Sequence, residues 1–159
     1  MVGGSYNTKI LPADKIVEIV EKLDAPVILL GGFGDMQRAK VIADAVGENV
    51  WNPVGMLNVE QSASIIKMSK AVLTGDTGMM HIAAALHKPI VSVWGNTVPE
   101  FGMYQYYPKK SNLELNIIEV KGLKCRPCSK LGYKKCPKGH FKCMNLIDVD
   151  EVVSKMQQY

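Results

Sequence analysis

Thr74-Gly75-Asp76-Thr77-Gly78-Met79-Met80-His81-Ile82-Ala83-Ala84-Ala85-Leu86 is the stretch that decides the fold of this chain. A β-branched, apolar run over residues 71–74 stops at Gly75-Asp76, and an Ala-rich helical run follows at once. This order predicts a parallel strand that ends at a binding crevice, where a helix starts with its free N–H groups facing the crevice. Thr77 and Gly78 lie in the first helical turn, where the helix macrodipole favours an anion. The stretch therefore predicts a site for a phosphate-bearing ligand.

Strand and helix patterns alternate along the whole chain. Strands separated by helices predict right-handed βαβ units, and hence a Rossmann-like α/β fold whose parallel sheet has helices on both faces. Ligands bind such sheets at the carboxyl ends of the strands, so the loops at 31–35, 75–78 and 95–102 are the candidate site. We expect strands near 27–30, 50–51, 71–74, 90–93 and 117–120, and helices near 12–23, 35–46 and 148–158. Two further helices are expected to start at Asn58, which has a capping-box spacing to Gln61, and directly after Gly75-Asp76.

Length and composition predict a single domain over residues 1–159. The chain is 47% hydrophobic, which is enough to bury one core. Its longest strongly apolar run, residues 27–30, is far shorter than a membrane span. The N-terminus has neither the basic start nor the apolar stretch of a secretion signal. We therefore expect a cytoplasmic protein.

Four side chains near the predicted crevice are candidates for ligand binding, and each has a plainer interpretation. Asp76 either faces the ligand or caps the helix, a role worth about 1 kcal/mol. His81 either joins Asp76 at the site or packs against the sheet. Asp35 offers two acceptor oxygens to ribose hydroxyls, although an N-cap fits its position equally well. Lys9 is an ordinary surface lysine unless the fold brings it over the phosphate site.

Three blocks of this sequence resemble the bacterial heptosyltransferase family, glycosyltransferase family 9. The first is the Asp-Thr-Gly-Met-Met-His-Ile-Ala-Ala-Ala-Leu block at 76–86, followed by Lys88-Pro89 and by Gly-Asn-Thr-Val-Pro at 95–99. The second is Thr-Lys-Ile-Leu-Pro at 8–12, which is similar to the family's Lys-x-x-Pro element. The third is Leu-Leu-Gly-Gly-Phe-Gly-Asp at 29–35. The resemblance is in order and in spacing from about residue 3 to residue 99.

This resemblance implies the C-terminal half of a two-domain, GT-B glycosyltransferase, which holds a nucleotide-sugar such as ADP-heptose. Lys9 would then contact the phosphates and Asp35 the ribose. The pyrophosphate and sugar would be surrounded by Asp76, Thr77, Gly78 and His81. The implied reaction is an inverting transfer of heptose to a lipopolysaccharide core acceptor, with no catalytic metal.

The resemblance also implies what this chain should lack. The family's general base lies on the N-terminal, acceptor-binding domain, and this chain has about half of the usual length. We therefore expect the base to be missing here, and we expect the chain alone to bind the donor with little or no turnover.

Four cysteines near the C-terminus form a C-x2-C-x7-C-x6-C pattern. The leading C-x2-C is a common half-site for tetrahedral zinc, and four thiolates would close the site, with His140 as a substitute ligand. The alternative is a loop of reduced, partly buried thiols. A similar tail occurs in some members of the family, which indicates a shared loop without identifying a metal. The candidate ligands are Cys125, Cys128, Cys136 and Cys143.

The same segment, residues 121–143, holds eight of the 19 basic residues and none of the 15 acidic ones. Its charge suits an anionic acceptor or a membrane surface, although solvated loop charge explains it too. The rest of the chain is acidic on balance, so a general nucleic-acid surface is not predicted.

Two other classes of function remain open. In one, the cysteines form a zinc knuckle of a nucleic-acid-binding module, although only Tyr133 and Phe141 are there to stack on bases. In the other, the chain is a sugar-nucleotide epimerase, which needs acid–base pairs at the crevice beyond Asp76 and His81.

Overall fold

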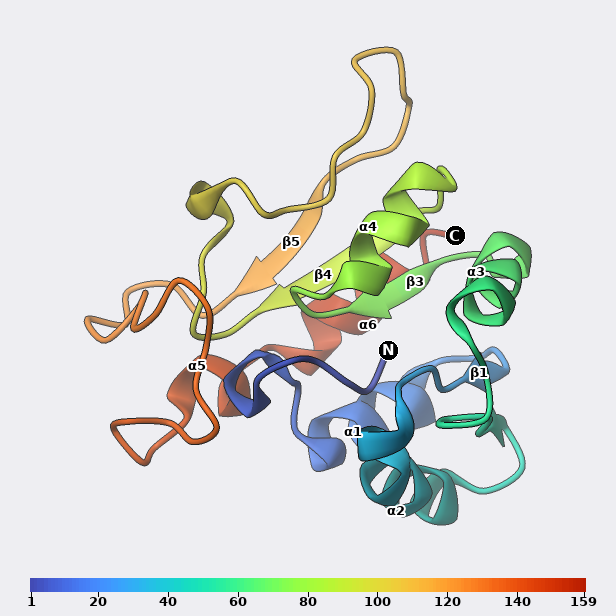
Figure 1. The fold of residues 1–159 in the computed structure, drawn as a ribbon, viewed down its shortest axis with the longest axis horizontal. Helices are drawn as coiled ribbons and strands as arrows, with labels where there is room; N and C mark the ends of the chain where they lie inside the picture. The colour runs from blue at the N-terminus through green and yellow to red at the C-terminus, as the bar shows by residue number, and fades with distance from the viewer.

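The computed structural model describes residues 1–159 and contains five strands with helices packed around them (Figure 1). Every strand pairing is parallel; β1 pairs with β2, and β4 lies between β3 and β5. All five expected strands are therefore present, and the Rossmann-like α/β class is confirmed. The strands are β1 (Val27–Ile28), β2 (Val50–Trp51), β3 (Val72–Thr74), β4 (Ile90–Trp94) and β5 (Asn116–Glu119).

Helices and short 3₁₀ turns, marked η, connect these strands. They are η1 (Asn7–Lys9), α1 (Ala13–Lys22), η2 (Phe33–Asp35), α2 (Met36–Val46), α3 (Val59–Met68), α4 (Gly78–Ala85), η3 (Pro99–Phe101), α5 (Lys142–Asn145) and α6 (Val149–Met156). A capping box starts α3: Gln61 N–H donates to the Asn58 side chain at 2.8 Å, and Asn58 N–H donates to the Gln61 side chain at 2.9 Å. The C-terminal helix is shorter than the expected range at both ends, because Asp148 is its N-cap and Gln157 its C-cap. None of these helices has both the length and the apolar character needed to cross a membrane.

The side chains of β4 alternate between two hydrophobic clusters, as the pleat of a strand requires. Val91 and Val93 pack on one face with buried residues of α1, α2 and α6. Ile90 and Trp94 pack on the other face with buried residues of α3 and α4. The expected covering of both faces is thus confirmed. Because β3 and β4 pair in parallel, their carboxyl ends are neighbours.

The sheet differs from expectation in one respect: it is divided between β1 and β3. The start of the chain lies between these strands (Figure 1). Val2 N–H donates to the Leu30 carbonyl at 2.9 Å, and the Met1 amine donates to the Leu73 carbonyl at 2.8 Å. Met1 and Val2 therefore link two sheets where the sequence pattern predicted one.

Candidate functional site

The glycines at the ends of β3 and β4 allow η1 to pack directly on the sheet edge. A Cβ on Gly75 would lie 2.6 Å from the Lys9 carbonyl oxygen, and one on Gly95 would lie 2.8 Å from that of Thr8. Because glycine has no side chain, another group can approach its backbone closely. At Gly75 and Gly95 the approaching group is the protein's own chain, and this contact brings Lys9 over the end of β3.

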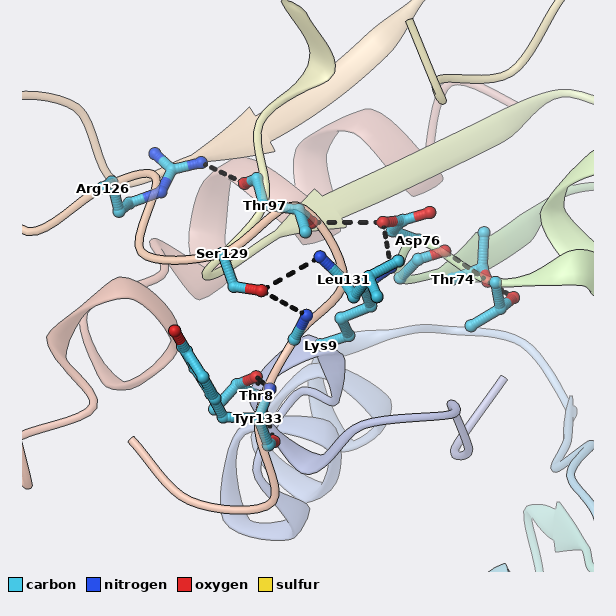
Figure 2. A network of polar contacts seen from close by, with 12 residues as sticks. Thr8, Lys9, Thr74, Asp76, Thr97, Arg126, Ser129, Leu131 and Tyr133 are labelled. Carbon is cyan, nitrogen blue, oxygen red and sulfur yellow. Dashed lines mark hydrogen bonds and ion pairs between the residues drawn. The ribbon is translucent and has the colours of Figure 1, made fainter. Parts of the chain in front are cut away.

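Lys9 and Asp76 form an ion pair at this point. Lys9 Nζ lies 2.6 Å from Asp76 Oδ2, and the two side chains are 13% and 8% exposed. The Thr97 hydroxyl, from the loop after β4, donates to the same carboxylate oxygen at 3.1 Å (Figure 2). Asp76 makes no capping bond to α4, whose N-cap is Thr77. The interpretation of Asp76 as a plain N-cap is therefore wrong, and Lys9 is not an ordinary surface lysine.

The first turn of α4 is open. No side chain caps it, and a Cβ on Gly78 would meet nothing within 4 Å. The hydroxyls of Thr74 and Thr77 lie 3.2 Å apart, beside the start of the helix. Because the first N–H groups of a helix have no partner within the helix, this end can receive an anion. His81 is exposed, so the interpretation that packs it against the sheet is wrong.

Asp35 lies on the neighbouring loop and caps its own turn. Its Oδ2 accepts the Gly32 N–H at 2.9 Å, and Arg38 Nη1 lies 3.7 Å from its Oδ1. A Cβ on Gly3 would overlap this carboxylate, and a Cβ on Gly4 would lie 3.6 Å from Thr77 Cγ2. The segment Gly3-Gly4 therefore runs between Asp35 and the start of α4. Asp35 stands at the N-cap position of α2, but its side chain makes no capping bond to that helix and instead accepts the Gly32 N–H of η2, so the interpretation of Asp35 as a plain N-cap of α2 is wrong.

Arg126 is a residue of this region that sequence reasoning missed. Its guanidinium donates to the carbonyls of Gly95, of Thr97 at 3.0 Å and of Val120 at 2.9 Å, and to the Glu119 carboxylate at 2.8 Å. It therefore holds the loop after β4, which carries Thr97, against the end of β5. Arg126 was counted among the basic residues of 121–143, yet it is the one arginine among lysines there. Only arginine has five donors on a rigid plane. A single arginine in a segment of lysines was therefore the sequence signal for a residue that makes several hydrogen bonds.

The cysteine segment packs on η1 from the other side. Thr8 and Tyr133 exchange three hydrogen bonds: Tyr133 N–H donates to the Thr8 hydroxyl at 2.8 Å, and the Tyr133 carbonyl accepts the Thr8 hydroxyl at 3.1 Å and the Thr8 N–H at 3.2 Å. The segment turns at Ser129, whose hydroxyl accepts the Leu131 N–H at 3.0 Å (Figure 2). The segment thus holds η1, and with it Lys9, from the side opposite the sheet.

The four cysteines do not gather into a metal site. No group of three or more His, Cys, Asp or Glu side chains is placed to hold a metal ion. Among these side chains, Cys125 Sγ lies 3.9 Å from His140 Nε2. Burial raises the pKa of Cys143 to about 11 and raises that of Cys128 above its ordinary value. None of the four cysteines forms a disulfide; Cys143 is buried and the other three are half-buried.

Comparisons with known proteins agree with this arrangement. The family model described as glycosyltransferase family 9 (heptosyltransferase) matches residues 1–133. Lipooligosaccharide heptosyltransferase 2 of Haemophilus ducreyi is 30% identical over 155 residues, which are 91% of this chain and 40% of that protein. Lipopolysaccharide heptosyltransferase 2 of Salmonella typhimurium is 35% identical over 79 residues, 47% of this chain and 23% of that protein.

The fold is also that of a solved heptosyltransferase. The structure of E. coli ADP-heptose LPS heptosyltransferase II matches 99% of this chain and 44% of that protein, with a TM-score of 0.74 at 21% identity. This chain therefore spans less than half the length of these relatives. Because the family model covers most of its residues, the chain belongs to glycosyltransferase family 9, the heptosyltransferase family.

Proposed function

We propose that residues 1–159 form the donor-binding half of an inverting heptosyltransferase and bind an ADP-sugar, such as ADP-heptose, by its diphosphate. The observation that carries the proposal is the uncapped start of α4 beside the Lys9–Asp76 pair. A helix N-terminus and an ammonium group both favour a diphosphate, and each leaves donors free for it. The solved E. coli heptosyltransferase WaaC with ADP supports this choice of nucleotide: it matches 99% of this chain and 42% of that protein, with a TM-score of 0.65 at 21% identity.

Each candidate residue has a separate role in this proposal. Thr77 and Gly78 offer main-chain N–H groups to the phosphates. Lys9 gives one of its three N–H donors to Asp76 and keeps the others for phosphate oxygens. Asp35 reaches the ribose from its own loop, and the exposed His81 faces the pyrophosphate and sugar from α4. Asp76 acts through Lys9, whose position it fixes.

The chemistry follows from what such a site stabilises. An acceptor hydroxyl oxygen attacks the anomeric carbon, the bond from that carbon to the diphosphate oxygen breaks, and ADP leaves with the electron pair. The α4 N-terminus and Lys9 stabilise the negative charge as it forms. The hydroxyl proton passes to a general base, which we assign to the acceptor-binding half of the enzyme.

The acceptor and the partner half follow from the same family. We assign the acceptor to a lipopolysaccharide core or a similar glycan, met at the inner face of the cytoplasmic membrane. The seven lysines of residues 121–143 are all exposed, while Arg126 is buried in its own contacts, so the lysines present positive charge to an anionic acceptor or lipid surface.

Calorimetric titration of the chain with ADP, UDP and GDP tests the donor assignment. We expect ADP to bind most tightly. We expect Lys9→Gln to weaken ADP binding by about tenfold, which corresponds to about 1.4 kcal/mol, the order of one hydrogen bond to a charged group. Lys15→Gln is the matched control, because Lys15 lies on α1 and pairs with Glu18 at 3.6 Å. If no nucleoside diphosphate binds, or if single-stranded RNA binds instead, the donor assignment is wrong.

A further inference from the structure

A cavity lies beside η1, apart from the candidate donor site. It encloses about 360 Å³, and its seven lining residues come from η1 and from residues 134–141. None of the residues assigned to the donor is among them. Small-molecule sites in proteins have volumes of about 300–1,000 Å³, so this cavity is large enough for one small ligand. We call it the η1 pocket.

The walls of the η1 pocket are tied by hydrogen bonds that leave one polar atom free. Asn7 Nδ2 donates to the Lys134 carbonyl at 3.0 Å, and Asn7 Oδ1 accepts no hydrogen bond. The Gly139 N–H donates to the Cys136 carbonyl at 3.0 Å and closes a turn. A Cβ on Gly139 would meet nothing within 4 Å, so the space beside this turn is empty. The pocket therefore exists before any ligand binds, with an amide oxygen available to a hydroxyl donor.

The η1 pocket is cationic. Lys134 and Lys135 line it, both are exposed, and neither forms an ion pair. None of the lining residues is acidic, and the sequence has no Asp or Glu between Glu119 and Asp148. Because no carboxylate of the protein neutralises these two ammonium groups, they favour an anionic ligand. A phosphomonoester, with about two negative charges at neutral pH, matches the two lysines better than a carboxylate does.

The rest of the lining indicates what carries this anion. The half-buried Phe141 contributes an apolar side chain, and Asn7 Oδ1 lacks a donor. A simple anion uses the lysines but neither of these two groups. A sugar ring uses both, because it presents an apolar face of C–H groups to an aromatic side chain and hydroxyl donors to an amide oxygen. The combination of groups therefore favours a phosphorylated sugar.

We propose that the η1 pocket binds a phosphorylated sugar residue of a glycan. Lys134 and Lys135 pair with the phosphate, Asn7 Oδ1 accepts a bond from a ring hydroxyl, and Phe141 contacts the ring. Since Asn7, Lys134 and Lys135 are all exposed, the pocket is open to solvent, and the anomeric carbon of the bound residue can carry the rest of the glycan. Binding does not depend on the donor site; the role of this glycan as the acceptor rests on the proposed function.

The 3₁₀ turn η1 stands between the pocket and the donor site. Asn7 and Thr8 line the pocket, whereas the next residue, Lys9, reaches Asp76 at the end of β3. The two sites therefore share one structural element but no side chain. A sugar phosphate in the pocket and ADP at the start of α4 should bind to the same molecule at the same time.

Calorimetric titration of the 159-residue chain with the methyl glycoside of glucose 6-phosphate tests the proposal. The blocked anomeric carbon imitates a glycan, and methyl glucoside and inorganic phosphate represent the two parts of the ligand. We expect the phosphorylated glycoside to bind at least about tenfold more tightly than inorganic phosphate, and methyl glucoside to show no binding. In the ¹⁵N-labelled chain the amides of Asn7 and Gly139 should shift, and that of Gly78 should not.

Two double variants with the same loss of charge separate the pocket from the basic segment as a whole. Lys134→Gln with Lys135→Gln alters the lining, whereas Lys130→Gln with Lys138→Gln alters two exposed lysines outside it. We expect the first to weaken binding of the phosphorylated glycoside by at least about tenfold, and the second by less than about twofold. Lys9→Gln and saturating ADP should leave this binding unchanged.

The outcomes that overturn the proposal differ from those that overturn the donor assignment. The pocket proposal is wrong if the phosphorylated glycoside does not bind, if inorganic phosphate binds as tightly, or if both double variants weaken binding equally. It is also wrong if Lys9→Gln or ADP abolishes binding, because the sugar phosphate then occupies the donor site. Loss of ADP binding alone, with the glycoside still bound, refutes only the donor assignment.

Discussion

Lys9 Nζ and Asp76 Oδ2 lie 2.6 Å apart, and this pair joins the 3₁₀ turn η1 to the end of strand β3. Both side chains are largely shielded from solvent, and the Thr97 hydroxyl supplies a further bond to the carboxylate. Removing one member of a shielded pair leaves the other without compensation, whereas removing both costs less. The pair therefore allows the effect of Lys9 on stability to be separated from its effect on binding.

We expect Lys9→Met to lower the free energy of unfolding by about 2 kcal/mol, since it leaves the Asp76 carboxylate with Thr97 alone. The double variant Lys9→Met with Asp76→Asn should recover part of this loss, yet it should not recover ADP binding. Urea denaturation and calorimetry measure the two quantities. If the double variant binds ADP as the native chain does, Lys9 has no part in the donor site.

Gly75→Ala should lower the stability of the chain, and Gly78→Ala should not. The new methyl group at position 75 would lie 2.6 Å from the Lys9 carbonyl oxygen, whereas the one at position 78 would meet nothing. We expect Gly75→Ala to displace η1 and lower the melting temperature. Gly78→Ala should leave it unchanged or raise it, because alanine is favoured over glycine in helices by up to about 1 kcal/mol. Equal melting temperatures for the two variants would show that η1 does not pack tightly on β3.

Arg126→Lys should destabilise the chain by about 2 kcal/mol although it keeps the charge. A lysine cannot reach the Glu119 carboxylate and the carbonyls of Gly95, Thr97 and Val120 together. The exposed Lys130→Met serves as the control and should change the free energy of unfolding by less than about 0.5 kcal/mol. If Arg126→Lys melts at the same temperature as the unchanged chain, the positive charge alone is enough to hold the loop after β4.

Stability should rise with pH between about 6 and 8 because of the Met1 amine. Burial lowers its pKa from 8.0 in the unfolded chain to about 6 in the folded one. Within this window the unfolded chain binds more protons, so raising the pH favours the folded chain, by about 2–3 kcal/mol over the two pKa units. Urea denaturation at pH 6 and pH 8 measures the rise. The N-terminally acetylated chain, which cannot bind this proton, should show a smaller one, and equal rises in both chains would refute the assignment.

Much of the fold follows from local patterns in the sequence. The capping box at Asn58 and Gln61 and the strand-to-helix change around Gly75 depend on neighbouring residues, and both are present in the structure. The division of the sheet between β1 and β3 does not follow from local patterns. It depends on which segment fills the space between two strands that are far apart in sequence.

The candidate site shows the same limit. Thr77 and Gly78 lie at the open helix start that the pattern predicted. The sequence could not show that Gly75 receives the Lys9 backbone instead of a ligand, nor that Asp76 pairs with Lys9. Both contacts are set by how η1 packs on the sheet. Arg126 escaped notice because its partners are mainly carbonyl oxygens, which leave no mark in the sequence.

The most direct measurement is a titration of the ¹⁵N-labelled chain with ADP, followed through the amide signals at the start of α4. The account predicts that the amides of Thr77, Gly78 and Met79 shift first and saturate together, because they meet the diphosphate. It predicts no comparable shift for the amide of Val41, a residue on the exposed side of α2. Saturable binding of ADP that leaves the α4 amides unmoved would contradict the account.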